Sequence, residues 1–264
     1  MTLSAGKKAA RQSLIVAELA LSPTVRTSAL AQRLGVSAET VRRDIEELTR
    51  RGLVSRTYGG AAGRQLGLQP DFSGRDTEAV AERDAVARLA SGFVKPGHVV
   101  MIDSGSTAAR FAQALAARDE RITVVTNGFA VAEAFMRSGN ARVMFCPGEA
   151  VARERGVYGS ETCGFLRRFF ADLVFIGASG LTAEGPTDVE AEACAVKRAM
   201  LERSDRRMLL IDSTKFGRRH FEIVCPLKSL SAIVADRPPD AALAEKLATN
   251  GVAVHAANRE EGTA

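Results

Sequence analysis

A short polar segment, Asp103-Ser104-Gly105-Ser106-Thr107, carries the residue types of an anion-binding loop. Gly105 allows a ligand to approach the backbone closely, Ser106 and Thr107 offer hydroxyl groups, and a helix that begins here presents unpaired N–H groups. Lys215, which follows another apolar segment, could add a cation. The same segment also has the composition of an ordinary helix cap. The residues alone therefore leave two interpretations open, a phosphate-binding loop or a structural turn.

The elements that must position these residues are visible in the hydrophobic pattern. Short apolar segments, each followed by a small polar loop, occur at 99–102, 122–125, 142–145, 173–176, 208–211 and 232–235, and helical patterns separate them. Continuous apolar strands that alternate with helices indicate a parallel α/β sheet with both faces covered. Ligands of such sheets bind beyond the carboxyl ends of the strands, so the polar loops can converge on one pocket.

Basic residues are concentrated in the first quarter of the chain. The 264 residues include 36 Lys and Arg against 31 Asp and Glu, a net charge of +5. Residues 1–63 hold ten basic and five acidic residues, and so carry the whole excess. A basic module joined to a neutral body suggests that the module meets a polyanion such as DNA, while the body does something else.

Residues 9–50 show the pattern of a helix-turn-helix. Apolar spacing predicts helices at about 9–21 and 27–34, and a third helix that opens at Ala38. Gly35 suits a left-handed position at a helix C-terminus, and Ser37 suits an N-cap. A helix, a glycine-containing turn and a second helix are the signature of this motif.

The third helix has an apolar face and a polar face. The apolar face consists of Ala38, Val41, Ile45 and Leu48. Thr40, Arg42 and Arg43 lie off this apolar face, near the N-terminus of the helix. In such motifs this end of the helix enters the major groove. There Arg can bind guanine, and Thr can reach a base or a phosphate. The alternative is a solvated helix with i, i+4 pairs between Glu39 and Arg43 and between Arg42 and Glu46.

The next segment predicts a wing. Residues 53–58 alternate like a strand, and Gly59-Gly60 makes a turn. This interpretation places Arg56 and Tyr58 near the DNA backbone or minor groove.

Together, residues 36–45, 52–56 and 58–61 resemble the DeoR family of bacterial transcription regulators, in which a recognition-helix motif and a wing motif occur at this spacing. The resemblance implies a winged helix-turn-helix that binds operator DNA, with Ser37, Thr40, Arg42 and Arg43 facing the DNA. It extends to the body, where the segments at 103–107, 125–127, 148, 159, 176–180 and 212–217 are similar, in order, to the family's C-terminal sensor domain. One departure is Pro147-Gly148, where the family usually has Gly-Gly.

The resemblance implies that the sensor domain binds a phosphorylated sugar or a related metabolite. The expected ligand-binding residues are Asp103, Gly105, Ser106, Thr107, Thr126, Asn127, Gly148, Ser179, Asp212 and Lys215. The expected fold is a winged helix-turn-helix domain at 1–61, a linker at 62–77 and an α/β sensor domain at 78–264. The expected function is a transcription regulator, a repressor of carbohydrate genes, that a phosphorylated metabolite releases from its operator.

Two other classes of function are weighed against this one. The sensor fold is similar to ribose-5-phosphate isomerase, but the carboxylates that an enediol mechanism needs are replaced here by Ile176, Ser179, Gly180 and Ser213. Glu190 and Glu192 could approach the site, but they fit better at the start of a helix over 189–204, where acids complement the dipole. An architectural DNA-binding protein would not need convergent polar loops. Binding without turnover is therefore the favoured interpretation.

Cysteine usage and spacing bear on location and cofactors. Cys146, Cys163, Cys194 and Cys225 are far apart and form no C-x-x-C pair, which favours buried thiols in a reducing cytoplasm and no metal site. No cofactor, no catalytic residue and no membrane contact are expected. A homo-oligomer, a dimer or a tetramer, is expected because one winged helix covers too few bases for specificity.

Overall fold

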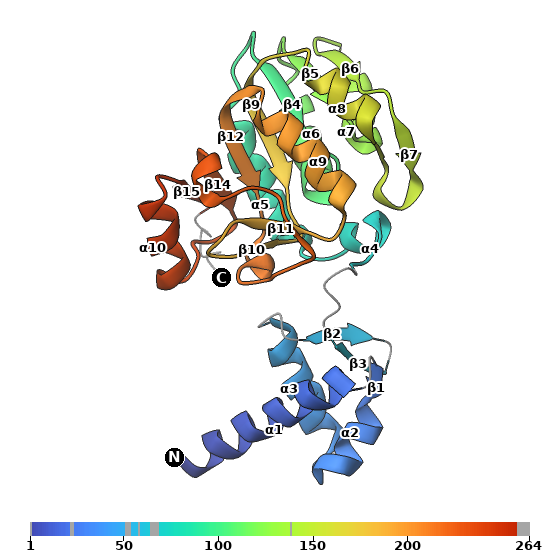
Figure 1. Cartoon of the computed structure of the whole chain (residues 1–264), viewed down its shortest axis with the longest axis vertical. Helices are drawn as coiled ribbons and strands as arrows, with labels where there is room; N and C mark the ends of the chain where they lie inside the picture. Colours follow the sequence, from blue (N-terminus) through green and yellow to red (C-terminus); the bar gives the residue numbers. More distant parts are fainter. Residues whose placement is uncertain are drawn as a thin grey trace, which may run out of the picture. The chain divides into compact units, whose positions relative to one another are not determined.

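The computed structural model describes residues 2–21, 24–50, 54–57, 59–63, 69–137 and 139–257. The chain divides into two compact units, Met1–Leu68 and Gln69–Ala264. The first is blue in Figure 1, and the second runs from cyan to red. None of the helices in the described part of the chain is long and apolar enough to span a membrane.

The N-terminal unit is a winged helix-turn-helix, as the sequence predicts. Its helices are α1 (Thr2–Leu21), α2 (Thr27–Leu34) and α3 (Ala38–Arg50), and its strands are β1 (Thr24–Arg26), β2 (Val54–Thr57) and β3 (Gly60–Gly63). The strands form an antiparallel sheet in the order β1-β3-β2. The predicted starts of α2 and α3 agree with the structure, whereas α1 begins earlier than the apolar pattern indicated.

Local chemistry explains the turn between α2 and α3. Gly35 adopts a left-handed conformation with φ 64°, and the hydroxyl of Ser37 accepts a hydrogen bond from the N–H of Thr40 at 3.1 Å. The apolar residues of the three helices and β2 then form one core, which includes Ile15, Leu30 and Val41.

A buried charge ties α3 to α1. Asp44 is 1% exposed, and its carboxylate accepts hydrogen bonds from the guanidinium of Arg11 and, at 3.4 Å, from the amide of Gln12. The carboxylate raises the pKa of Arg11, so the recognition helix is joined to the first helix by an ion pair as well as by apolar packing.

The C-terminal unit is built on a parallel sheet of seven strands in the order β15-β14-β12-β9-β4-β5-β6. The strands are β4 (Val99–Ile102), β5 (Thr123–Thr126), β6 (Arg142–Phe145), β9 (Ala171–Gly177), β12 (Ser204–Leu210), β14 (Ala232–Ala235) and β15 (Ala253–Ala256). All six apolar segments that the sequence marked as strands belong to this sheet, which confirms the α/β prediction.

Two smaller sheets lie outside the main one. β7 (Glu149–Val151) and β8 (Gly156–Tyr158) form a hairpin, and β10 (Gly180–Leu181), β11 (Pro186–Asp188) and β13 (Glu222–Ile223) form a three-stranded antiparallel sheet. The sequence analysis did not predict either sheet, because their strands are only two or three residues long.

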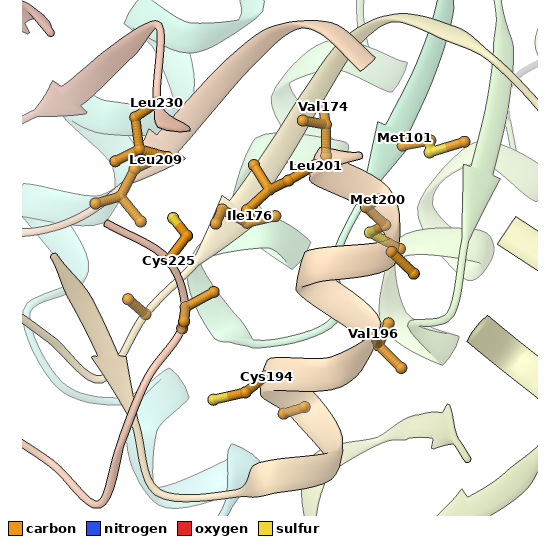
Figure 2. Packing of buried hydrophobic residues seen from close by; sticks show 14 of the residues in the cluster. Met101, Val174, Ile176, Cys194, Val196, Met200, Leu201, Leu209, Cys225 and Leu230 are labelled. Atoms are coloured by element: carbon orange, nitrogen blue, oxygen red, sulfur yellow. The ribbon is translucent and has the colours of Figure 1, made fainter. Parts of the chain in front are cut away.

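Helices cover both faces of the parallel sheet (Figure 1). α5 (Val80–Ser91), α6 (Ser106–Ala116) and α7 (Phe129–Met136) pack on one face. α8 (Ser160–Leu166), α9 (Ala191–Leu201) and α10 (Ala241–Thr249) pack on the other. Figure 2 shows Val196, Met200 and Leu201 of α9 among the sheet residues Val174 and Ile176.

The range that the sequence analysis interpreted as a linker contains a helix. α4 (Phe72–Asp76) belongs to the C-terminal unit, and both Phe72 and Arg75 are buried there. The buried face of α5 includes a charged residue. Val80 is 39% exposed because it is the first residue of the helix, and Arg83, rather than Val80, precedes Val86 on the buried face.

The four cysteines are unpaired and buried, as expected. Burial raises the pKa of Cys146 and of Cys194 to about 12, and that of Cys225 to about 11. Figure 2 shows Cys194 on α9 and Cys225 on a neighbouring segment, both within the core. These thiols act as small apolar side chains.

Candidate functional site

The loops that follow β4 and β9 line a small pocket of about 40 Å³. β4 and β9 are neighbours at the centre of the sheet, and the chain continues to β5 and β6 on one side and to β12, β14 and β15 on the other. This is the topological switch point, where open α/β sheets bind their ligands. Asp103, Gly105, Ser106, Thr107, Ser179 and Lys215, six of the ten predicted ligand-binding residues, line the pocket.

The floor of the pocket is the N-terminus of α6. Gly105 occupies the N-cap position with φ 112° and has no side chain to cap the first turn. The N–H groups of that turn have no intrahelical partner and carry partial positive charge. The hydroxyl of Thr107 is buried and has no hydrogen-bond partner among the described residues. A buried hydroxyl without a partner is costly, and an anion at this helix end would satisfy it.

Lys215 extends toward this helix end from the loop after β12. Its ammonium donates to the carbonyl of Ala178 at 2.8 Å and lies 3.7 Å from the Asp212 carboxylate, beyond hydrogen-bonding distance. Burial, together with the nearby cations Arg83 and Arg75, lowers the pKa of Lys215 to about 8, against the opposing effect of Asp212. An ammonium has three donors, and the contact with Ala178 uses one of them.

Behind α6 lies a buried cation that the sequence analysis missed. Arg83 of α5 is 2% exposed, donates to the hydroxyl of Ser106 at 3.1 Å, and lies 3.5 Å from the Asp212 carboxylate. Burial opposes the charge of Asp212, but Lys215, Thr214 and Arg83 together lower the pKa of this carboxyl. Asp212 does not line the pocket, but it lies close to both cations, the buried Arg83 and the pocket-lining Lys215.

A second group of charges, Asp103, Asp188 and Lys197, also lines the pocket. The ammonium of Lys197 pairs with Asp188 and lies 3.5 Å from Asp103, and Asp188 also accepts from the hydroxyl of Ser179 at 2.8 Å. Burial raises the pKa of Asp103, despite the nearby ammonium. For Asp188 the ammonium and the hydrogen bonds outweigh burial and lower the pKa. The nearby acids raise the pKa of Lys197 against the effect of burial.

Of the three other predicted ligand-binding residues, Asn127 and Thr126 are buried and bonded to backbone, whereas Gly148 is exposed. Asn127 is fully buried, accepts from the N–H of Ser104 at 3.1 Å and donates to the carbonyl of Val157 at 3.0 Å. Thr126 accepts from the N–H of Gly128 at 3.0 Å. Gly148 has φ 147° and packs against Tyr158 and Thr162. None of the three lines the pocket.

Sequence reasoning also missed an ion pair that lines the pocket. Arg75 of α4 and Glu154 are paired at 2.6 Å, each with a side chain 10% exposed. No local pattern marks this pair, whose members lie far apart in the sequence. Arg83 and Lys197 could have been found, because each occupies a position on the apolar face of its helix, where a charge needs a buried partner.

The predicted DNA-facing residues on α3 share its polar surface. Ser37, Arg42 and Arg43 are exposed, and Thr40 is half-buried, with its hydroxyl 2.8 Å from that of Ser37. Both arginines lie near Glu39, at 3.5 and 3.3 Å. β2 and β3 form the predicted wing, but the side chain of Arg56 and all of Tyr58 lie outside the described residues.

Comparisons with known proteins agree with this architecture. The model of the DeoR-like helix-turn-helix domain matches residues 11–64, and that of the DeoR C-terminal sensor domain matches residues 78–237. The chain is a DNA-binding transcription regulator with a sensor domain. It belongs to the DeoR family.

Several bacterial and archaeal regulators are similar over most of their length. The glycerol-3-phosphate regulon repressor of Escherichia coli is 30% identical over 224 residues, 84% of this chain and 88% of that protein. The HTH-type transcriptional repressor GlcR of Bacillus subtilis is 28% identical over 90% of this chain and 92% of its own. The regulator GlpR of Haloferax volcanii is 29% identical over 93% and 96%, respectively.

Among solved structures, ribose 5-phosphate isomerase A of Methanocaldococcus jannaschii is similar over 51% of this chain and 53% of its own, with 18% identity and a TM-score of 0.38. The family models and the relatives are transcription regulators and not enzymes, so the isomerase alternative from the sequence analysis does not hold.

Proposed function

We propose that the protein is a cytoplasmic repressor of carbohydrate-metabolism genes, which a phosphorylated sugar or a related metabolite releases from its operator. Relatives named as a glycerol-3-phosphate regulon repressor and as the repressor GlcR support this class of function. The metabolite is called the effector below, and the pocket at β4 and β9 the effector pocket.

The observation that carries the proposal is the N-terminus of α6. The pocket combines the uncapped N–H groups of this helix, the unpartnered buried hydroxyl of Thr107 and the ammonium of Lys215. A phosphate needs backbone donors, hydroxyls and a cation, and this arrangement supplies all three. The acids that line the pocket, Asp103 and Asp188, are suited to accept hydrogen bonds from sugar hydroxyls.

DNA recognition is assigned to the exposed face of α3 and to the wing. Arg42 and Arg43 are exposed near the N-terminal end of α3. They are positioned to enter a major groove when contacts with DNA replace their ion pairs with Glu39. Specific recognition also requires more than one half-site, and we therefore include a homo-oligomer in the proposal.

The test is release of the protein from DNA upstream of its own gene, measured with sugar phosphates, glycerol 3-phosphate and the unphosphorylated form of each. The effective compound should be phosphorylated. Lys215→Ala should raise the half-release concentration roughly tenfold or more, because a charge-assisted contact contributes about 1.5–3 kcal/mol. Lys228→Ala, at an exposed lysine, is the matched control.

A second variant separates binding from folding. Thr107→Val keeps the shape of the side chain and removes a hydroxyl that has no partner in the described structure. It should leave thermal stability unchanged or higher, and still raise the half-release concentration several-fold. Equal potency of phosphorylated and unphosphorylated compounds, or a normal response of both variants, would show that this helix end is only a structural cap.

A further inference from the structure

The effector pocket contains a side chain from the segment that leads to the DNA-binding unit. Gln69 is the first residue of the C-terminal unit, and it lines the pocket. Its amide oxygen lies 2.6 Å from the hydroxyl of Ser179. Ser179 also donates to Asp188, another residue that lines the pocket. Gln69 therefore occupies the part of the pocket beside Ser179 and Asp188.

The space that remains is too small for the proposed effector. The pocket measures about 40 Å³. Pockets that hold small-molecule ligands measure about 300–1,000 Å³. A phosphate can reach the N-terminus of α6, but the rest of a sugar phosphate needs more space, and Gln69 occupies part of the space beside Ser179.

The chemistry of the contact is that of a sugar hydroxyl. Ser179 has one hydroxyl proton and two acceptors within reach, Gln69 at 2.6 Å and Asp188 at 2.8 Å. If the proton goes to Asp188, a half-turn of the Gln69 amide lets its NH₂ group donate to Ser179. A hydroxyl of the effector can make the same donation and accept the same proton. The amide and the effector thus compete for one partner.

The position of Gln69 in the chain connects this competition to DNA binding. β3 of the wing ends at Gly63, and residues 64–68 join it to Gln69. On the other side, Pro70 limits the backbone of Gln69 to extended conformations, and the carbonyl of Pro70 accepts from Arg75 at 2.8 Å. Gln69 and Arg75 are therefore two anchors of residues 69–76, and displacement of Gln69 removes one of them.

We propose that Gln69 is a built-in occupant of the effector pocket, which the effector must displace and whose displacement releases one anchor of residues 69–76, the segment that follows the link to the DNA-binding unit. This inference rests on the proposed function. Gln69 is thus a positioning residue, which sets the sensitivity of the regulator rather than the chemistry of recognition. The effector shifts the equilibrium because it binds only the form from which Gln69 has left.

The first experiment does not need an effector. Hydrogen exchange of the backbone amides of α4, measured in the full-length protein, should be faster in Gln69→Ala than in the unmutated chain, because one anchor of the segment is lost. Gln113→Ala, at an exposed glutamine on α6 that does not line the effector pocket, is the matched control and should leave α4 unchanged. Equal exchange in the two variants would overturn the inference without reference to any ligand.

The second experiment uses the compound that proves most potent in the operator-release titration. Gln69→Ala should lower the half-release concentration about three- to tenfold, because the effector no longer has to break the hydrogen bond between Gln69 and Ser179, and one such bond contributes a factor of this size. Gln113→Ala should not change the half-release concentration. An unchanged or higher concentration in Gln69→Ala would overturn the inference, since Gln69 would then be a bystander or a direct contact of the effector. If no phosphorylated compound releases the unmutated protein, the proposed function fails, and the exchange measurement still decides the role of Gln69.

Discussion

The guanidinium of Arg83 donates to the hydroxyl of Ser106 at 3.1 Å and reaches the Asp212 carboxylate at 3.5 Å. One buried cation therefore joins the first residue of α6 to the loop that carries Lys215. The arrangement of the residues that line the effector pocket therefore depends on Arg83, which lies outside the pocket.

Arg83→Ala should lower the free energy of unfolding by about 3 kcal/mol, because removal of one partner leaves a buried carboxylate with weaker compensation. The measurement is urea unfolding of the full-length protein, followed by a signal from the C-terminal unit. Arg88→Ala, at an exposed position of the same helix, should change stability little. Equal stability of the two variants would show that the Arg83–Asp212 pair does not stabilise the fold.

Arg42→Ala and Arg43→Ala should each weaken operator binding, by roughly tenfold or more for an arginine that reads a base. Both side chains are exposed, so folding should change little. Affinity is measured at one fixed salt concentration, with Arg137→Ala, an exposed arginine of the sensor unit, as the control. Unchanged affinity in both α3 variants would exclude this face from DNA contact.

The response to the effector should weaken as pH rises through about 8, the pKa of Lys215. Above that pH the neutral amine cannot attract a phosphate, which is already a dianion because its second pKa is about 6. The same titration affects folding stability in the opposite direction, so stability should increase as pH rises. The pKa is lowered from 10.5 in the unfolded chain, so the cost of burying the ammonium is fully present below pH 8 and disappears as pH rises toward 10.5.

The pH dependence can be separated from other titrations by Lys215→Arg, because a guanidinium stays charged throughout this range. Half-release concentrations measured from about pH 6.5 to pH 9 should rise at the alkaline end for the unmutated protein and stay level for the variant. The same alkaline rise in both proteins would assign the dependence to another group.

Gly148→Ala should destabilise the sensor unit by about 2 kcal/mol or more. Gly148 has φ 147°, and an added Cβ would lie 2.6 Å from the carbonyl oxygen of Tyr158. Gly139→Ala is the control, because a Cβ there meets nothing within 4 Å. Thermal unfolding of the two variants measures the difference, and a Gly148→Ala protein as stable as the control would contradict the close packing at Pro147-Gly148.

A fragment of residues 69–264 should fold and bind the effector without binding DNA. A shorter fragment of residues 78–264 should be less stable, because it lacks Arg75 and leaves Glu154 buried without its partner. Thermal unfolding of both fragments measures this. Equal stability would place the boundary of the sensor domain at 78, as the sequence analysis expected, and make α4 part of the linker.

The strands of the parallel sheet and the helices of the N-terminal unit could be predicted because each depends on a local pattern. Gly35 and Ser37 mark their turn by conformational preference and capping chemistry. The buried ion pairs could not be predicted as pairs. The sequence shows only that Lys197 lies on the apolar face of a helix. Its partners come from the loop after β4, which holds Asp103, and from the end of β11, which holds Asp188, and only the folded chain brings them together.

The expectation for Asn127 shows a different limit. Its position at the end of a strand marks it as part of the ligand-binding edge of the sheet, and the structure places it there. Whether such a side chain points into the pocket or supports a loop depends on the backbone around it. Asn127 bonds Ser104 and Val157, and it is fully buried behind the pocket.

The Arg11–Asp44 ion pair fixes α3 to α1 from the buried side, while Glu39, Arg42, Arg43 and Glu46 are exposed on the other side. Mutations on the exposed side can therefore accumulate during evolution without disturbing the packing of the helix. Duplicated copies of such a gene can acquire different operators by changing these few positions, and each copy keeps an unchanged frame for holding its recognition helix.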